Sequence, residues 1–340
     1  MPPRVFLAFV APSLLLMLAF IALPLASVLS QSFFVTQGVF EEVMVETCTP
    51  GFPSQTCVEE VRSRPVMQDG APVTRTAFAG LENYRLLLRP DAVGQAFSPG
   101  GGGLADVLNI DFYKALRFTL TFALVTLPFI IGLGLLVALA VNSIARSLRG
   151  PVIFVSLLPY IITPVIGALS IRWLFVGDGI LTAALRHATG SNVSMFAQGW
   201  TIELLMLFYR VWHVAPFAFV VFYAGLQTVS QDALEAATID GATRLERLRY
   251  VVVPHLAPLI VFVALIHLMD AYRVFDEVIG FRSEAYRISL QWLTFNLLTP
   301  DQTGNRAVAR ASACAVLTML GIVVLLVPPL LRSWREHRGR

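Results

Sequence analysis

The amino-acid sequence predicts an all-α integral membrane protein, and both its composition and the placement of its apolar residues lead to that fold class. Of its 340 residues, 56% are hydrophobic and only 14% are charged, whereas a soluble domain usually carries about 25% charged residues. The apolar residues fall in long runs that match the roughly 20 residues an α-helix needs to cross a bilayer core of about 30 Å. A globular cytosolic enzyme is therefore disfavoured.

Six stretches of the sequence are predicted to be transmembrane helices. They cover about residues 5–30, 115–142, 151–176, 201–226, 255–275 and 307–331. The first could be mistaken for a secretory signal, because Arg4 precedes it. The apolar region of a signal is only about 7–15 residues long, whereas this stretch continues from Val5 to Val28. We therefore expect a retained helix over residues 1–30.

The arginines in the short connections predict the orientation of the chain. Cytoplasmic loops carry an excess of Lys and Arg, and six spans place all the arginine-rich connections and both termini on one side. We expect that side to be the cytoplasm, with residues 332–340 as a cytoplasmic tail. The arginines concerned are Arg4, Arg146, Arg149, Arg244, Arg247, Arg249, Arg332, Arg335, Arg338 and Arg340.

Residues 31–112 are then expected outside the membrane, as an enlarged first external loop region. The segment is acidic on balance, and its glycine run at 100–103 predicts a flexible loop. Cys48 and Cys57 lie in it, on the oxidising side, where disulfides persist. We predict a short-loop disulfide between them, the alternative being two free thiols. Cys314 lies in an apolar stretch and is expected to be a packing residue.

The charged and histidine residues argue against several functions for this chain. A net charge of only +3 gives nucleic-acid binding no support. Lys114 is the only lysine and does not follow a glycine, so the chain lacks the P-loop lysine that reaches the β/γ-phosphates of ATP. The five histidines are scattered, with no HExxH pair, and no G-x-S-x-G elbow occurs. We expect no catalytic residue, metal site or cofactor in this chain.

The fourth connection predicts a cytoplasmic helix–turn–helix. Ser230 and Asp232 are candidate caps for an alanine-rich helix that breaks at Gly241, and Pro254 opens the next span. Small residues on one face of this first helix suit close packing into a partner's cleft. The alternative is a solvated surface helix.

The same connection resembles the EAA loop of binding-protein-dependent ABC importer permeases. The resemblance rests on Glu235-Ala236-Ala237, then three residues to Gly241, then Val251, Val253 and Pro254. The two valines stand where the family usually has Ile and Leu. The resemblance implies a coupling helix that docks on the ATPase subunit. It implies that Glu235 is a polar anchor, that Ala236 and Ala237 permit close approach, and that Gly241 forms the turn. Asp240 and Pro254 are the other residues expected in the coupling site.

Four further segments look like sugar-type permeases of the maltose, glycerol-phosphate and trehalose group. They are residues 11–14, 78–84, 158–164 and 270–276. The resemblance implies a six-helix type I ABC importer transmembrane domain, with residues 113–331 as a five-helix core after the first span. The first periplasmic loop is longer than is usual for the group.

Ionisable and aromatic residues within the spans are candidates for the solute path, because charges at membrane depth are costly. Arg172, Arg210 and Arg310 lie towards the external ends of their spans, where snorkelling to the interface is the alternative reading. Residues 212–217 add Trp212, His213 and Phe217 beside Pro216. A proline in a span frees backbone groups that tend to line cavities, although a plain kink is the alternative.

The fifth span supplies the remaining candidates. His267, Asp270 and Val274 share one face of a regular helix. Asp270 is a possible partner of Arg273, and Arg273 of Asp276 or Glu277. In similar permeases the equivalent parts of the fourth and fifth spans bind solute, which implies roles for His267, Asp270, Tyr272 and Arg273. A structural ion pair that holds the bundle is the competing interpretation.

The expected function is therefore that of a permease subunit in an ATP-driven sugar importer of the bacterial inner membrane. The partners implied are a second, different permease chain, two ATPase subunits that bind ATP and Mg, and a periplasmic or lipid-anchored solute-binding protein. A permease for amino acids or peptides is the first alternative. An ion-coupled secondary transporter and an intramembrane enzyme are further alternatives.

Overall fold

A computed structural model describes residues 3–49, 56–68, 71–177, 179–190, 194–300 and 306–338. The chain divides into two compact units. The first consists of Met1–Gly103 and Leu293–Leu317, and the second of Leu104–Trp292 and Thr318–Arg340. The last helix, α16 (Val308–Arg338), begins in the first unit and continues into the second.

The first unit starts with a long apolar helix. Helix α1 (Pro3–Met17) continues through the π-helical turn η1 (Leu18–Ala22) into α2 (Leu23–Gln31). Its segment Phe9–Gln31 is long and apolar enough to cross a membrane, and none of its most apolar stretch is buried within the chain. Such a surface is stable against lipid or another apolar helix but not against water.

The external segment is more ordered than its composition predicts, because it contains antiparallel strands. Strand β1 (Phe34–Gly38) pairs with β6 (Thr74–Phe78), β2 (Phe40–Thr49) with β3 (Thr56–Pro65), and β4 (Met67–Gln68) with β5 (Ala71–Pro72). The sequence analysis predicted no strands within this loop region. Valines at alternate positions, such as Val43 and Val45 in β2, are the strand pattern that outweighs the nearby Gly and Pro.

The two external cysteines occupy opposite positions in the β2–β3 hairpin. The antiparallel register pairs Cys48 with Cys57. Directly opposite residues are close enough for their side chains to interact. Their side chains lie outside the described part of the structure, so the disulfide stays a prediction. Cys314 is fully buried, as predicted for a packing residue.

Hydrogen bonds from a short helix hold the C-terminal end of the first span. Helix α3 (Glu82–Leu88) is followed by α4 (Pro90–Ala96). In α3, the amide of Asn83 donates to the carbonyl oxygens of Ser32 (2.8 Å) and Phe34 (2.9 Å). The Tyr84 hydroxyl donates to Ser32 Oγ (2.7 Å). Ser32 is fully buried, so these bonds satisfy backbone groups that would otherwise be left unpaired where the helix ends.

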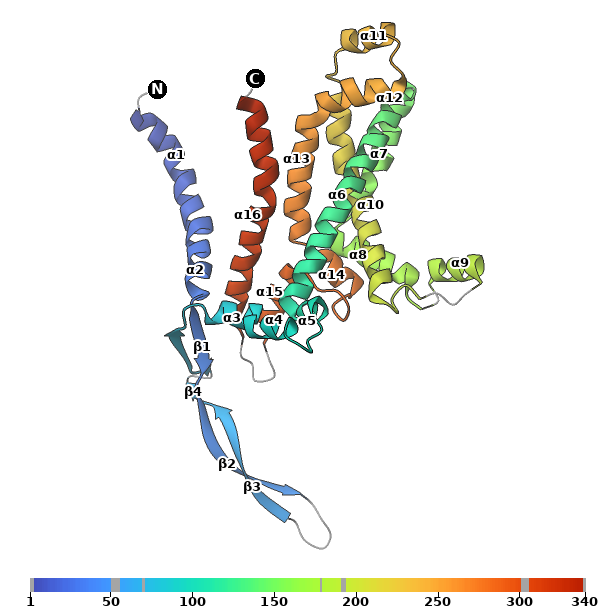
Figure 1. The fold of residues 1–340 in the computed structure, drawn as a ribbon. Helices are drawn as coiled ribbons and strands as arrows, with labels where there is room; N and C mark the ends of the chain where they lie inside the picture. The colour runs from blue at the N-terminus through green and yellow to red at the C-terminus, as the bar shows by residue number, and fades with distance from the viewer. Residues whose placement is uncertain are drawn as a thin grey trace. The chain divides into compact units, whose positions relative to one another are not determined.

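The second unit is a bundle of apolar helices (Figure 1). Its members are α5 (Leu104–Asn109), α6 (Asp111–Ser143), α7 (Arg146–Ile161), α8 (Pro164–Phe175), α9 (Ile180–Thr189), α10 (Gly199–Leu226), α13 (Val253–Tyr272), α14 (Asp276–Phe281), the first part of α15 (Leu290–Leu298) and the rest of α16. Among the described residues, five helices are suited to cross a membrane, or six if α7 and α8 form one span. The helices match the predicted spans closely, except for the third.

The third predicted span, residues 151–176, is broken rather than continuous. Helices α7 and α8 are bent by 91°, and Ile162 and Thr163 between them have extended backbone angles (ψ 132° and 130°). Pro164 explains the break, because a proline disfavours the helical conformation of the residue before it. Pro164 is visible in the sequence, but the apolar residues on both sides of it predicted a single continuous span.

Helices α6 and α10 pack closely through small residues. A Cβ atom on Gly134 would lie 2.6 Å from the Ala218 Cβ and 3.0 Å from the backbone nitrogen of Phe219. Small residues allow transmembrane helices to approach in this way. Around this contact lies an apolar cluster that includes Ile130, Ala138 and Phe222. The α6–α10 pair therefore forms the centre of the second unit.

Gly134→Ala is expected to destabilise the second unit by about 1–3 kcal/mol, because the added methyl meets backbone that must shift. Gly132→Ala is the matched control on the same helix, since nothing lies within 4 Å of its added methyl. Thermal unfolding of the detergent-purified protein measures the difference. Equal midpoints for the two variants would contradict the close α6–α10 contact.

Candidate functional site

The connection between α10 and α13 forms a capped helix and a sharp turn at one end of the second unit (Figure 1). Helix α11 (Gln231–Ile239) begins at Ser230, whose Oγ accepts a hydrogen bond from the backbone N–H of Ala233 (3.3 Å). It ends at Asp240, and Gly241 follows with φ +79°. Glycine adopts this left-handed conformation without the steric cost that other residues incur. The predicted cap and break are confirmed.

A second short helix returns the chain to the bundle. Helix α12 (Arg244–Arg247) starts with a reciprocal capping box between Thr243 and Glu246. The Arg247 guanidinium donates to Thr238 Oγ1 (2.8 Å), which ties α12 to α11. The π-helical turn η2 (Leu248–Val252) then leads into α13, with Pro254 in its first turn. These bonds give the loop a defined shape of its own.

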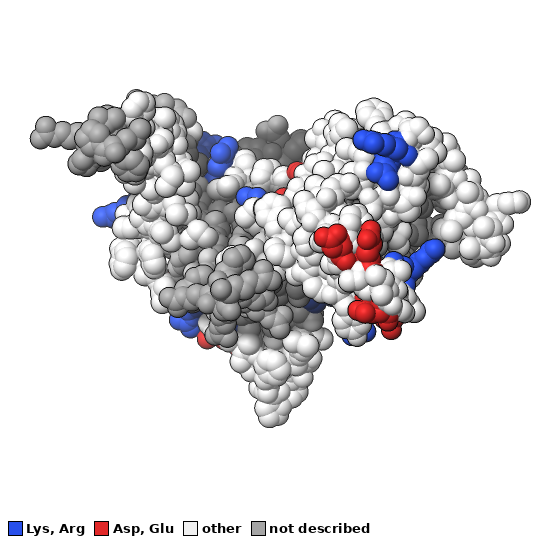
Figure 2. Space-filling model, turned by 90° about the horizontal axis from the view of Figure 1, so that it is seen from above, with Lys and Arg blue, Asp and Glu red and all other residues white. Residues whose placement is uncertain are grey.

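The outer surface of α11 is unoccupied by other parts of the described chain. Asp232, Glu235, Ala236 and Asp240 are exposed, and Ala237 is half-buried. Acidic side chains gather on this face (Figure 2). Ile239, at the end of the helix, is 86% exposed. The structure thus brings the loop residues predicted for coupling onto one exposed face, and it places Pro254 apart from them, at the start of α13.

The second region of interest is a cavity of about 470 Å³ inside the second unit. Helices α7, α8, α10, α13 and α14 all contribute to its lining. Of the residues predicted for the solute path, five line it, and they are Arg210, His213, Phe217, His267 and Asp270. The other lining residues are Tyr160, Pro164, Val214, Ile266, Met269 and Asp276.

Three predicted residues lie elsewhere. Trp212 lines a separate cavity of about 270 Å³. Tyr272 is buried against Gly321 of α16, where any Cβ would collide with its hydroxyl. Arg273 is exposed just after the end of α13. The structure therefore does not place these three side chains in the cavity with the others.

A buried ion cluster forms one side of the cavity. The Arg210 guanidinium donates through Nη1 to Glu277 Oε1 (2.8 Å) and through Nη2 to Asp270 Oδ2. The side chains of Arg210 and Glu277 are only 6% and 2% exposed, whereas that of Asp270 is 55% exposed. Asp270 is thus the member of the cluster that other groups can reach.

Two carboxylates hold Arg210 inside the bundle, which argues against the alternative reading in which it snorkels to the interface. Two predictions are corrected. Asp270 and Glu277 pair with Arg210 rather than with Arg273. Val274 does not continue the face of His267 and Asp270, because α13 ends at Tyr272. The early end of the helix points Arg273 outward and allows α14 to bring Glu277 back towards α10.

Two histidines line the cavity, and their hydrogen bonds indicate which ring nitrogen carries the hydrogen. The Thr126 hydroxyl donates to the Phe122 carbonyl (2.6 Å) and lies 2.8 Å from His267 Nε2, so Nε2 carries the hydrogen. His213 Nε2 lies 2.9 Å from the Ile162 carbonyl oxygen, which can only accept. Within the described residues, Nδ1 of each ring is buried and has no hydrogen-bond partner. Both Nδ1 atoms are therefore enclosed by protein atoms.

Aromatic rings complete the lining. The rings of Tyr160 and Phe217 stack with centroids 5.9 Å apart and planes 23° from parallel. Tyr209 supports the site from behind, with its ring 5.5 Å from that of His213 and its hydroxyl donating to the Pro164 carbonyl (2.8 Å). Sequence reasoning missed Tyr209 and Thr126, because a lone tyrosine or threonine in an apolar run has no distinguishing pattern.

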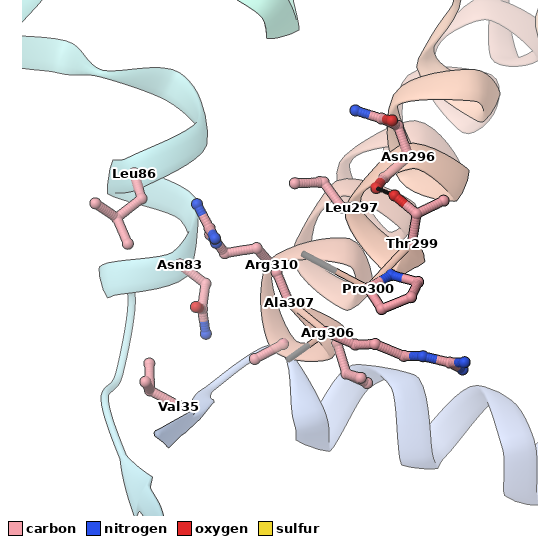
Figure 3. Close-up of a pocket in the computed structure, with 12 residues that line it drawn as sticks. Val35, Asn83, Leu86, Asn296, Leu297, Thr299, Pro300, Arg306, Ala307 and Arg310 are labelled. Atoms are coloured by element: carbon pink, nitrogen blue, oxygen red, sulfur yellow. Dashed lines mark hydrogen bonds between the residues drawn. The ribbon is translucent and has the colours of Figure 1, made fainter. Parts of the chain in front are cut away.

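A further cavity of about 460 Å³ lies in the first unit, between α3, α15 and the start of α16 (Figure 3). Asn83, Arg306 and Arg310 are among its lining residues. Both arginines are exposed, which is compatible with the alternative reading of Arg310 as an interfacial residue. Apart from Arg310, none of the residues predicted for the solute path lines this cavity.

No group of three or more His, Cys, Asp or Glu side chains in the described ranges is arranged to hold a metal ion. The polar groups of the larger site are instead arranged as ion pairs and as donors and acceptors around a cavity. That arrangement suits a hydrogen-bonded solute.

Residues 111–328 match the sequence profile of a family described as the binding-protein-dependent transport system inner membrane component. This chain belongs to that family. The matched range contains the α11–α12 loop and every residue that lines the cavity of the second unit. Both candidate regions are therefore parts of the family domain of this permease.

Two curated relatives are similar to this permease over more than half of its length. The trehalose transport system permease protein SugA of Mycobacterium tuberculosis is 29% identical over 208 residues, 60% of this chain and 59% of the relative. The sn-glycerol-3-phosphate transport system permease protein UgpA of Agrobacterium fabrum is 28% identical over 253 residues, 71% of this chain and 83% of the relative. This permease thus spans less than two thirds of SugA.

A solved structure shares the fold. A bacterial ABC transporter involved in the import of the acidic polysaccharide alginate contains a chain with a TM-score of 0.59 and 21% sequence identity. The alignment covers 74% of this permease and 91% of that chain. The all-α membrane fold predicted from the sequence is therefore that of an ABC importer transmembrane domain.

Proposed function

We propose that this chain is a permease subunit of an ATP-driven importer that carries a sugar or a related polyol. The observation that carries the proposal is the cavity of the second unit, which lies among the membrane-spanning helices. It combines stacked aromatic rings with a few fixed polar groups, and sites for small molecules are usually built in this way. The similarity to SugA, a trehalose transport system permease protein, and to UgpA, a sn-glycerol-3-phosphate transport system permease protein, supports the same class of solute.

The α11 loop is the element we propose for coupling to an ATPase. Its short helix is capped, tied to α12 and exposed on its outer face, so a partner can pack against Ala236 and meet Glu235 without displacing anything in the chain. Gly241 forms the turn that follows α11 and so allows the outer face of this helix to remain exposed. ATP and Mg then bind to the partner, since Lys114 is the only lysine in the chain. This function requires the α11 end of the bundle, and with it both termini, to be cytoplasmic.

The remaining exposed apolar surfaces fit further subunits and lipid. Only 17% of the most apolar stretch of α16 is buried within the chain, and the first span is exposed throughout. We propose that a second, different permease chain covers part of this surface and closes the solute path. An external solute-binding protein, soluble or lipid-anchored, delivers the solute on the opposite side from α11.

Affinity purification of the chain from its native membrane in mild detergent tests this proposal. The expected co-purifying proteins are an ATPase, a second permease and an external solute-binding protein whose ligand is a sugar or polyol. A binding protein specific for amino acids or peptides would assign the solute to the alternative class. Recovery of the chain alone, with solute transport in liposomes without ATP, would contradict an ATP-driven importer and favour an ion-coupled carrier.

A further inference from the structure

We infer that the cavity of the second unit accepts hydroxyl-rich solutes without negative charge and excludes phosphate esters and uronates of similar size. The inference rests on the proposed function and narrows its solute class. The family does not decide the matter, because the names of the relatives include both an uncharged sugar and a phosphate ester.

The single guanidinium in the lining is already occupied. Arg210 is the only lysine or arginine among the residues that line the cavity. Both of its terminal nitrogens donate to carboxylates, at 2.8 Å for Glu277. An anionic solute would have to displace Asp270 from this cation, and the displaced carboxylate would then remain beside it. Arg210 therefore holds the helices together rather than offering a vacant anion site.

Negative groups outnumber positive ones at the site. Asp270 and Asp276 line the cavity, and Glu277 lies directly behind the guanidinium. These three carboxylates face one arginine. Charges interact more strongly inside a protein than in water, and a buried anion is costly unless it is paired. The site therefore repels a phosphate or carboxylate.

The carboxylates that reach the cavity call for hydroxyl groups. Asp270 and Asp276 line the cavity, and the side chain of Asp270 is 55% exposed. A carboxylate accepts hydrogen bonds, and an ionised phosphate or carboxylate has no hydrogen to donate. A polyol supplies several O–H donors. The stacked rings of Tyr160 and Phe217 offer an apolar face for the C–H side of a sugar ring.

Matched pairs of solutes test this inference on the purified complex in lipid nanodiscs, with the external binding protein removed. The probes are trehalose and trehalose 6-phosphate, glucose and glucuronate, and glycerol and sn-glycerol 3-phosphate, at equal ionic strength. Binding is measured as the concentration dependence of the shift in thermal unfolding. In each pair that binds, the charged member should bind at least about tenfold more weakly, as expected for one charge near an unpaired carboxylate at an effective dielectric constant of about 20.

A charge-neutralising variant makes the test specific to the cavity. Asp276→Asn should reduce the discrimination within each pair, by improving binding of the charged member several-fold. Asp232→Asn, on the exposed face of α11, is the matched control and should leave the discrimination within each pair unchanged. A charged member that binds the unaltered complex as tightly as its neutral partner would overturn the inference and leave the sugar function standing. Absence of binding by every probe to an intact complex would overturn the sugar function itself.

Discussion

Replacing Arg210 with methionine (Arg210→Met) is expected to lower the thermal unfolding midpoint of the permease by roughly 6–20 °C. The guanidinium neutralises Glu277, whose side chain is only 2% exposed. Removing one partner of a buried ion pair costs about 3–5 kcal/mol, because the remaining charge is left uncompensated. Each kilocalorie corresponds to a shift of about 2–4 °C for a protein of 150–250 residues. Scanning fluorimetry of the detergent-purified complex measures the midpoint.

Two further variants separate this explanation from a general effect of losing an arginine. Arg273→Met removes an exposed arginine on the adjoining segment and should change stability by no more than about 0.5 kcal/mol. The double replacement Arg210→Met with Glu277→Leu removes both charges and should recover much of the loss. Equal midpoints for Arg210→Met and Arg273→Met would show that the Arg210 cluster does not stabilise the bundle.

Gly241→Val is expected to reduce ATP-driven uptake about 5–30-fold while the subunit remains in the membrane. Gly241 has φ +79°, and a side chain there costs about 1–2 kcal/mol, which corresponds to a 5–30-fold change in a two-state population. Nothing lies within 4 Å of a Cβ at this position, so the loss would come from the backbone and not from a clash. Uptake and solute-stimulated ATP hydrolysis are measured per amount of complex.

Matched substitutions separate backbone conformation from other effects of altering the loop. Gly241→Asn should retain most of the uptake, because asparagine tolerates the left-handed conformation. Gly150→Ala in α7 also places a methyl group in open space and should leave uptake unchanged. Glu235→Ala should lower uptake through loss of the polar anchor on the ATPase, without a change in stability. Normal uptake by both Glu235→Ala and Gly241→Val would refute the coupling role.

Features that depend on local sequence were predictable. Hydropathy located the spans, and the turn after α11 could be placed because Gly241 interrupts an alanine-rich helix with a capping serine. The break before Pro164 was predictable in principle, since a proline restricts the residue before it. It was missed because an unbroken apolar run on both sides suggested a single span.

Features that depend on tertiary contact were not predictable in the same way. The Arg210–Glu277 pair joins residues 67 positions apart, and helical spacing offered Arg273 as an equally reasonable partner. The position at which α13 ends determines that Arg210, and not Arg273, pairs with Glu277. Helix ends are the least certain feature of a sequence-based assignment. The donor on each histidine likewise depends on Thr126 and on the Ile162 carbonyl, which belong to other helices.

The pairing of β1 with β6 determines how the segment between these two strands joins the rest of the chain. Gly38 lies opposite Thr74, so the chain departs from the first span and returns at neighbouring positions. Asn83 fastens that junction to the end of the span. The residues between Gly38 and Thr74 therefore form an insertion whose length can vary without moving the two positions at which it joins the rest of the chain. This makes the hairpin a natural place to exchange one sequence for another, or to insert a reporter without disturbing the membrane-spanning helices.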